Sequence, residues 1–177
     1  MKRETVVIEQ KMVKKLCGNL LWALKAKSND SSRYVMNNIF VDGDDIVCTD
    51  GRRLHIWKGG RLISPLKEEG MYQVIKGGNY FIFNPVDDGD FPNYKKIIPA
   101  KKDRQHKYDI VLNSGSASAA VGFLSHFYYK GKKSLNYQFM KDLEGFSWIV
   151  SSSENDVGLC FENDDLLAIV MPLLITF

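Results

Sequence analysis

The sequence predicts an α+β fold in which two helices pack on one side of antiparallel sheets. Two stretches place apolar residues at helical spacing, and about nine short apolar stretches are bounded by turn residues. A chain of 177 residues can bury its own core, and 45% hydrophobic with 25% charged residues is a globular composition. These values argue against a disordered chain, a collagen-like repeat and a coiled coil.

The first elements are a strand over Thr5–Glu9 and an amphipathic helix over Gln10–Lys27. The apolar stripe of this helix recurs every four residues, at Met12, Leu16, Leu20 and Leu24. Its lysines fall largely off that stripe, so one face of the helix is expected to be buried and the other basic. A polar loop, Ser28–Ser32, follows.

Three strands joined by tight turns come next. Strands are expected over Tyr34–Val41 and Asp45–Thr49, joined by a hairpin turn at Asp42-Gly43. A second turn at Asp50-Gly51 leads to a third strand over Arg53–Trp57, whose residues alternate in polarity. The sequence therefore predicts a three-stranded antiparallel meander here.

The middle of the chain is again β-like. Strands over Tyr72–Ile75 and Tyr80–Phe83 flank a Gly77–Asn79 turn, and prolines exclude a helix interior over Phe91–Pro99. A strand is expected over Tyr108–Leu112.

The last third is expected to hold the second helix between strands. The small residues of Asn113–Ala120 predict a loop, and Val121–Tyr129 is strand-like. A shorter helix is expected over Leu135–Leu143, capped by Ser134 or Asn136. Three strands close the chain, over Phe146–Ser151, Val157–Glu162 and Leu166–Ile175.

Charge is distributed unevenly along the chain. Residues 1–33 hold eight Lys and Arg against three acids, and residues 92–133 hold nine against two. Residues 134–177 reverse the sign, with one lysine against seven acids. This asymmetry suits contact with a polyanion or head-to-tail docking of copies, although solvated loops would give the same pattern.

Several function classes lack their sequence signals. The longest apolar run, Leu166–Ile175, is too short to span a bilayer, and no signal peptide pattern is present, so a cytoplasmic protein is expected. Three widely spaced cysteines and three scattered histidines predict neither a disulfide framework nor a metal site. The acid clusters are explained by turns, and neither a phosphate-binding glycine loop nor a nucleophile motif occurs. We therefore expect no cofactor and no enzymatic activity.

One segment resembles a known motif. Val47-Cys48-Thr49-Asp50-Gly51-Arg52-Arg53-Leu54 is similar to the Ala-Thr-Asp-Gly-His-Arg-Leu signature of the bacterial sliding clamp, the β subunit of DNA polymerase III. Four further segments are similar to the clamp in family order: Arg33–Asn38, Asp88–Pro99, Leu135–Leu143 and Ile169–Ile175. The departures are Cys48 for the signature Ala, Arg52 for its His, and Leu174 for a basic residue near the carboxyl end of the clamp.

The resemblance implies a DNA-clamp-like fold. A full clamp chain carries three such domains and closes a ring as a dimer, whereas this sequence has helices enough for one. The implied organisation is a single clamp-like domain over residues 1–177, with residues 60–120 an insertion or the remnant of a second clamp domain.

The resemblance also implies a processivity or accessory factor that binds DNA without reading its sequence. The expected DNA-facing residues are those of the basic helix face: Lys11, Lys14, Lys15, Lys25 and Lys27. Replication or repair proteins are expected to bind through a short hydrophobic peptide motif. The implied peptide site is lined by Met36, Thr49, Gly51, Arg52, Arg53, Leu54, Pro92, Ile97, Val170, Met171, Pro172 and Leu173.

Two hypotheses follow from the resemblance. In the first, several copies assemble into a homo-oligomer that encircles DNA, because a single copy cannot. In the second, the protein is a monomeric peptide-binding adaptor or decoy. Each site residue also has an ordinary explanation, such as core packing for Met36, Leu54, Ile97 and Val170, or a turn for Gly51.

Overall fold

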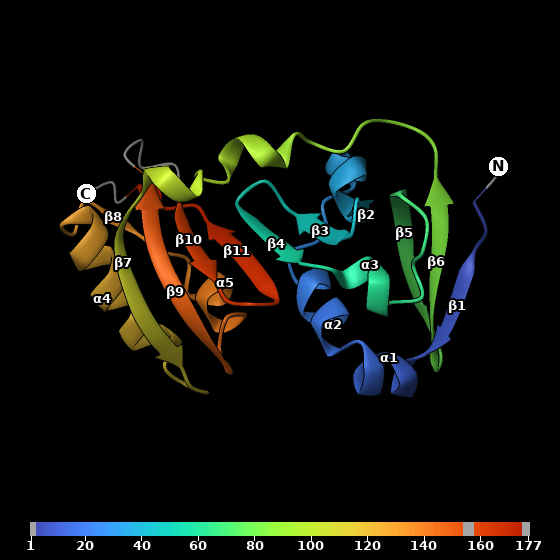
Figure 1. Cartoon of the computed structure of the whole chain (residues 1–177), viewed down its shortest axis with the longest axis horizontal. Helices are drawn as coiled ribbons and strands as arrows, with labels where there is room; N and C mark the ends of the chain where they lie inside the picture. Colours follow the sequence, from blue (N-terminus) through green and yellow to red (C-terminus); the bar gives the residue numbers. More distant parts are fainter. Residues whose placement is uncertain (1–2, 154–157, 175–177) are drawn as a thin grey trace. The chain divides into compact units, whose positions relative to one another are not determined.

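The computed structural model describes residues 3–153 and 158–174. The chain divides into two compact units, Met1–Asn93 and Tyr94–Phe177, each with helices and an antiparallel sheet (Figure 1). The α+β class predicted from the sequence is thus confirmed. Among the described residues, no helix is long and apolar enough to cross a membrane.

The sheet of the first unit has the strand order β1-β6-β5-β2-β3-β4, and every pair is antiparallel. Its strands are β1 (Val6–Glu9), β2 (Asn38–Asp42), β3 (Asp45–Thr49), β4 (Arg53–Trp57), β5 (Gly70–Gly77) and β6 (Tyr80–Val86). The predicted hairpin turn is present between β2 and β3, where Asp42 pairs with Asp45. The predicted turn between β5 and β6 is present too, with Gly77 opposite Tyr80.

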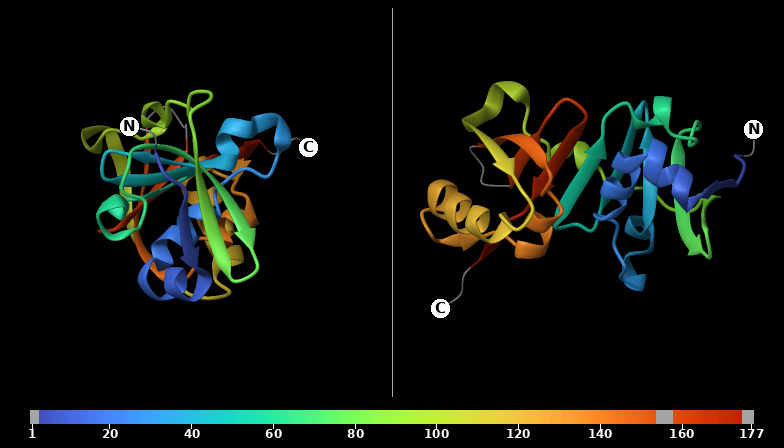
Figure 2. Two further views of the ribbon diagram at one scale, coloured as in Figure 1. Left: turned by 90° about the vertical axis from the view of Figure 1, so that its right-hand side faces the viewer. Right: turned by 90° about the horizontal axis from the view of Figure 1, so that it is seen from below.

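The predicted helix over Gln10–Lys27 is two helices, α1 (Gln10–Leu16) and α2 (Gly18–Leu24). Cys17 breaks it, with φ −134° and ψ 44°, and the next residue is Gly18, a poor helix former. The predicted apolar stripe is only partly buried: Leu20 has no exposed surface and Leu24 is half-buried, but Met12 is 42% exposed. Val13, the next residue, is buried in its place. In the right-hand view of Figure 2, α1 and α2 lie in front of strands of their own unit, and α2 packs on β3 and β4.

The strand predicted over Tyr34–Val41 starts later than expected. Residues Ser31–Asn37 form the 3₁₀ helix η1, and β2 begins at Asn38. The carboxylate of Asp30 caps η1 by accepting a hydrogen bond from the Ser32 backbone N–H at 2.9 Å. A short helix, α3 (Gly60–Ile63), follows β4.

The second unit has a sheet of order β11-β10-β9-β7, also antiparallel, and a separate pair β12-β8. Its strands are β7 (Arg104–Leu112), β8 (Lys133–Ser134), β9 (Phe146–Ser153), β10 (Leu159–Glu162), β11 (Leu166–Val170) and β12 (Leu173–Leu174). The strand predicted over Leu166–Ile175 is therefore two strands separated at Met171-Pro172, because proline lacks the N–H that a ladder needs. Val157 and Ile175, the ends of two predicted strands, lie outside the described residues.

The largest difference from the sequence prediction is α4 (Ala117–Tyr129), where a loop and a strand were expected. Ala117, Ala120 and Leu124 are buried along one side of this helix, and alanine has the highest helix propensity. The backbone N–H of Ala117 donates to Glu144 Oε1 at 2.9 Å, which satisfies one free donor of the first turn.

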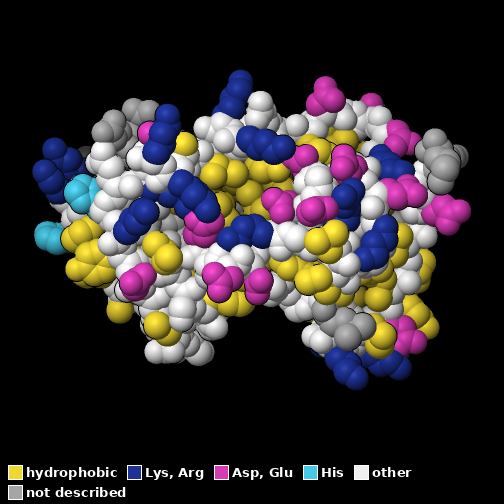
Figure 3. All heavy atoms as spheres, in the orientation of Figure 1, with side chains coloured by type: hydrophobic (Ala, Val, Ile, Leu, Met, Phe, Trp, Pro, Cys, Tyr) yellow, Lys and Arg dark blue, Asp and Glu magenta, His cyan; other side chains and the backbone are white. Residues whose placement is uncertain are grey.

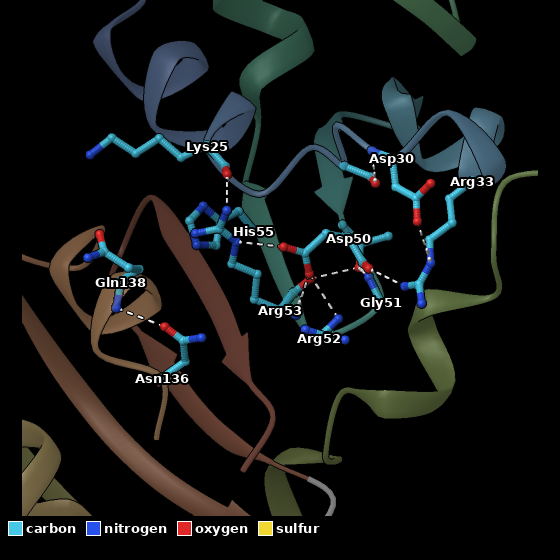
Figure 4. Close-up of polar contacts among 12 residues, drawn as sticks. Lys25, Asp30, Arg33, Asp50, Gly51, Arg52, Arg53, His55, Asn136 and Gln138 are labelled. Atoms are coloured by element: carbon cyan, nitrogen blue, oxygen red, sulfur yellow. Dashed lines mark hydrogen bonds and ion pairs between the residues drawn. The ribbon is translucent and has the colours of Figure 1, made fainter. Parts of the chain in front are cut away.

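The second predicted helix is confirmed as the shorter α5 (Tyr137–Lys141). Asn136 is its cap, because the Asn136 side chain accepts from the Gln138 N–H at 2.8 Å (Figure 4). Two 3₁₀ helices, η2 (Tyr94–Ile97) and η3 (Lys101–Asp103), precede β7.

Residues 60–120, which are expected from the resemblance to be an insertion or the remnant of a second clamp domain, contribute strands to the sheets of both units. It supplies β5 and β6 to the first unit and β7 to the second.

Candidate functional site

The turn between β3 and β4 is held by its own side chains (Figure 4). Asp50 Oδ1 accepts from the backbone N–H groups of Arg52 at 2.9 Å and Arg53 at 3.0 Å. Asp50 Oδ2 accepts from Arg53 Nε at 3.1 Å. Thr49 Oγ1 donates to the Arg53 carbonyl at 2.7 Å and accepts from the Gly51 N–H at 3.1 Å. These bonds fix the shape of the turn and leave Gly51 and Arg52 exposed.

Gly51 is required by both its backbone and its neighbours. Its φ is +83°, a region that residues with a Cβ rarely adopt. A Cβ at this position would lie 3.0 Å from Arg33 Nη1 and 3.6 Å from Met36 Sδ. Met36 and Gly51, two of the predicted peptide-site residues, therefore lie side by side.

Two arginines tie the turn to neighbouring segments. Arg33 Nη1 donates to the Asp50 carbonyl at 2.8 Å, and Arg33 Nε lies 3.8 Å from Asp30 Oδ2. Arg53 Nη2 donates to the Lys25 carbonyl after α2. The guanidinium groups thus hold η1, the turn and the end of α2 in one arrangement.

Three of the predicted peptide-site residues are buried. Leu54 and Val170 have no exposed surface, and Thr49 is also buried. Their side chains belong to the cores of their own units and can only support residues that are exposed. Pro92 in the first unit and Ile97 in the second are half-buried.

The remaining predicted residues of the second unit lie where β11 ends. Met171 and Pro172 are half-buried, and Leu173 is 40% exposed. A Cβ built on Gly158 would lie 3.1 Å from Met171 Sδ and 3.0 Å from the Val170 carbonyl oxygen. Gly158 therefore lets the Met171 side chain pack closely against the sheet.

The predicted DNA-facing lysines fall into two groups. Lys11, Lys14 and Lys15 are exposed on α1, and Figure 3 shows dark-blue side chains at the lower edge of the first unit. Lys25 and Lys27 follow α2, beyond the break at Cys17. Lys11 pairs with Glu9 at 2.8 Å, and Lys27 Nζ donates to the Ser28 carbonyl at 3.2 Å.

Sequence reasoning missed the role of His55, which it considered only as a scattered histidine. His55 is fully buried, and its Nδ1 donates to the Trp22 carbonyl at 3.1 Å. Burial lowers its pKa to about 3, so the ring is neutral near pH 7. The alternation of polarity over Arg53–Trp57 places His55 on the same face as Arg53 and so gave no signal of burial, whereas β4 is buried on both faces from Leu54 to Trp57.

Comparison of structures places this fold among the bacterial DNA polymerase III β subunits. The β subunit of Borrelia burgdorferi, solved with a natural product, superimposes with a TM-score of 0.57 at 16% identity, covering 99% of this chain and 65% of that one. The Thermotoga maritima β subunit gives 0.58 at 12% identity, covering 99% and 67%. A Pseudomonas aeruginosa sliding clamp gives 0.55 at 17% identity, covering 97% and 66%.

This chain has the sliding-clamp fold. At these identities the superpositions show the fold alone, and the clamp resemblance noted in the sequence is confirmed at that level. The chain spans about two thirds of the length of the clamp chains it matches. No protein-family model and no curated protein matches the sequence.

Proposed function

We propose that this protein is a non-enzymatic, sliding-clamp-like accessory factor that binds DNA through phosphate contacts and recruits replication or repair partners through a short hydrophobic peptide. The observation that carries the proposal is the clamp fold over 97–99% of the chain, together with the turn at Asp50-Gly51, where Met36 lies beside Gly51. Clamp folds typically serve as binding scaffolds rather than as enzymes.

DNA binding is assigned to the lysines of α1. Lys14 and Lys15 are exposed, as phosphate contacts require. We expect a labelled 30-bp duplex to bind in fluorescence anisotropy, and a Lys14→Glu/Lys15→Glu variant to bind at least tenfold more weakly. The control is Lys76→Glu, which reverses one exposed lysine on β5 of the same unit. Equal affinity of the α1 variant and wild type would rule out this face.

Partner binding is assigned to the predicted peptide-site residues, and each unit is tested by its own variant. We expect a peptide rich in Gln, Leu and Phe to bind, and Met36→Ala or Met171→Ala to weaken it about fivefold to tenfold. Leu62→Ala is the control, because Leu62 is 65% exposed on α3, outside the predicted set. Undiminished binding by both methionine variants would refute the peptide site.

A monomeric peptide-binding adaptor or decoy is the second candidate function. It is favoured by the break at Cys17, which divides the predicted basic face into two groups of lysines. Light scattering separates the candidates: a stable oligomer large enough to surround a duplex supports the clamp, and a strict monomer at high concentration supports the adaptor.

A further inference from the structure

An aromatic surface lies on the second unit, formed by Tyr108 of β7 with Phe123 and Phe127 of α4. Their exposed fractions are 43%, 46% and 41%. The two phenylalanine rings are nearly parallel, at 16°, with centroids 5.8 Å apart, and Tyr108 meets Phe127 edge-on at 5.0 Å. Three rings that could fill a core are thus turned to solvent as one cluster.

The cluster is fixed to the sheet by Tyr128. Its hydroxyl donates to the His106 carbonyl at 2.5 Å and lies 3.1 Å from the Val150 carbonyl. Burial raises the pKa of Tyr128 to about 12, so the hydroxyl keeps its proton. His106 occupies a bulge of β7 with φ 50°, and its ring lies 6.4 Å from that of Phe127. The rings therefore sit on a positioned scaffold rather than on a loop.

Positive charge adjoins the aromatic surface. No acidic residue occurs between Asp109 and Asp142, a stretch with four lysines. Asp109 itself neighbours Tyr108 on β7, so strand alternation turns it to the opposite face. A pocket of about 230 Å³ at the carboxyl end of α4 is lined by Tyr128, Tyr129, Lys130, Lys132 and Lys133. At the left end of Figure 3, hydrophobic side chains lie beside histidine side chains, and cationic side chains lie above the histidines.

We propose that this surface binds single-stranded DNA, with bases stacked on Phe123 and Phe127 and phosphates held at Lys130 and Lys132. Aromatic rings beside a cationic groove are the elements that bind single strands without reading sequence. A duplex keeps its bases stacked on one another, so it cannot use the rings. An apolar protein partner would leave the side chains of Lys130 and Lys132 without partners. The choice of DNA over RNA rests on the proposed function.

The test variant replaces Phe123 and Phe127 by leucine, which removes the aromatic rings but keeps an apolar side chain at both positions. We expect a labelled 20-nucleotide oligo(dT) to bind in fluorescence anisotropy, and Phe123→Leu/Phe127→Leu to bind at least tenfold more weakly, because leucine cannot stack. Phe123→Tyr keeps a ring and should retain affinity. Tyr80→Leu is the matched control, since Tyr80 is 45% exposed on the first unit. Thermal melting confirms that each variant folds.

Several outcomes would overturn this inference. They are no oligo(dT) binding at low salt, equal binding by the leucine variant, or tighter binding of oligo(rU) than of oligo(dT). A change of oligomeric mass in the leucine variant, with DNA binding unchanged, would make the surface an interface between copies instead. The duplex assay with the α1 lysine variant uses other residues in the other unit, so failure of one proposal is distinguishable from failure of the other.

Discussion

The imidazole of His55 on β4 stacks on the indole of Trp22 on α2, with ring centroids 4.1 Å apart and planes inclined by 6°. His55 Nε2 has no hydrogen-bond partner among the described residues, and its Nδ1 is bound to the Trp22 carbonyl. The stack joins the helix to the sheet strand that follows the signature turn. It also buries a titratable group in the core of the first unit.

This burial makes stability depend on pH. The folded His55 has a pKa of about 3, below its ordinary value of 6.5, so the unfolded chain binds a proton first as pH falls. Stability should therefore be complete above pH 6.5 and fall by about 1.4 kcal/mol per pH unit below it. Urea unfolding at pH 7, 6 and 5 measures this slope. His55→Phe should show a smaller slope than wild type, and identical slopes would contradict the account.

Gly51→Ala should destabilise the protein by about 2 kcal/mol or more. The φ of +83° strains any residue with a Cβ, and the methyl group would also press on Arg33 Nη1. Gly43→Ala is the control, since Gly43 has φ +60° with nothing within 4 Å of its Cβ position. Thermal unfolding should show a larger loss for Gly51→Ala, and an equal or smaller loss would show that the Arg33 contact has no effect.

Asp50→Ala should cost about 1–3 kcal/mol, because it removes the acceptor for two backbone N–H groups and for Arg53 Nε. Asp50→Asn keeps one oxygen acceptor and should cost less. Chemical denaturation of both variants checks the order. If Asp50→Ala and Asp50→Asn lose the same stability, the hydrogen bonds from Asp50 to the backbone N–H groups of the turn do not account for the loss.

Glu144→Ala should weaken the first turn of α4 by about 1 kcal/mol, because Glu144 Oε1 accepts from the Ala117 N–H. Glu144→Gln retains an acceptor oxygen and serves as the control. Amide hydrogen exchange rates of residues 117–120 measure how far the first turn of α4 is weakened. Unchanged exchange in Glu144→Ala would show that the cap does not hold this helix end.

Features set by neighbouring residues could be predicted from the sequence, whereas features set by distant contacts could not. The turns at Asp42-Gly43 and Gly77–Asn79 were predicted because turn residues act locally. The break at Cys17 was not, since the apolar spacing runs through it. The α4 helix was missed because its buried side begins with alanines, which give a weak hydrophobic pattern.

The same distinction between local and distant contacts holds at the candidate site. The clamp signature pointed to Gly51 and its turn, but the bonds from Arg33 to the Asp50 carbonyl and from Arg53 to the Lys25 carbonyl join segments far apart in the chain. No local pattern encodes such contacts. For Leu54 and Val170 the sequence left core packing and a place in the peptide site both open, and only the tertiary structure shows that both side chains are fully buried.

The salt dependence of duplex binding tests the DNA-binding proposal most directly. Each phosphate contact adds about 0.9 to the slope of log Kobs against log salt concentration. We predict a steep negative slope for the wild-type protein and a slope reduced by about two in Lys14→Glu/Lys15→Glu. A wild-type affinity that does not change between 50 and 200 mM NaCl, or a slope that the variant leaves intact, would contradict the proposal that α1 faces DNA.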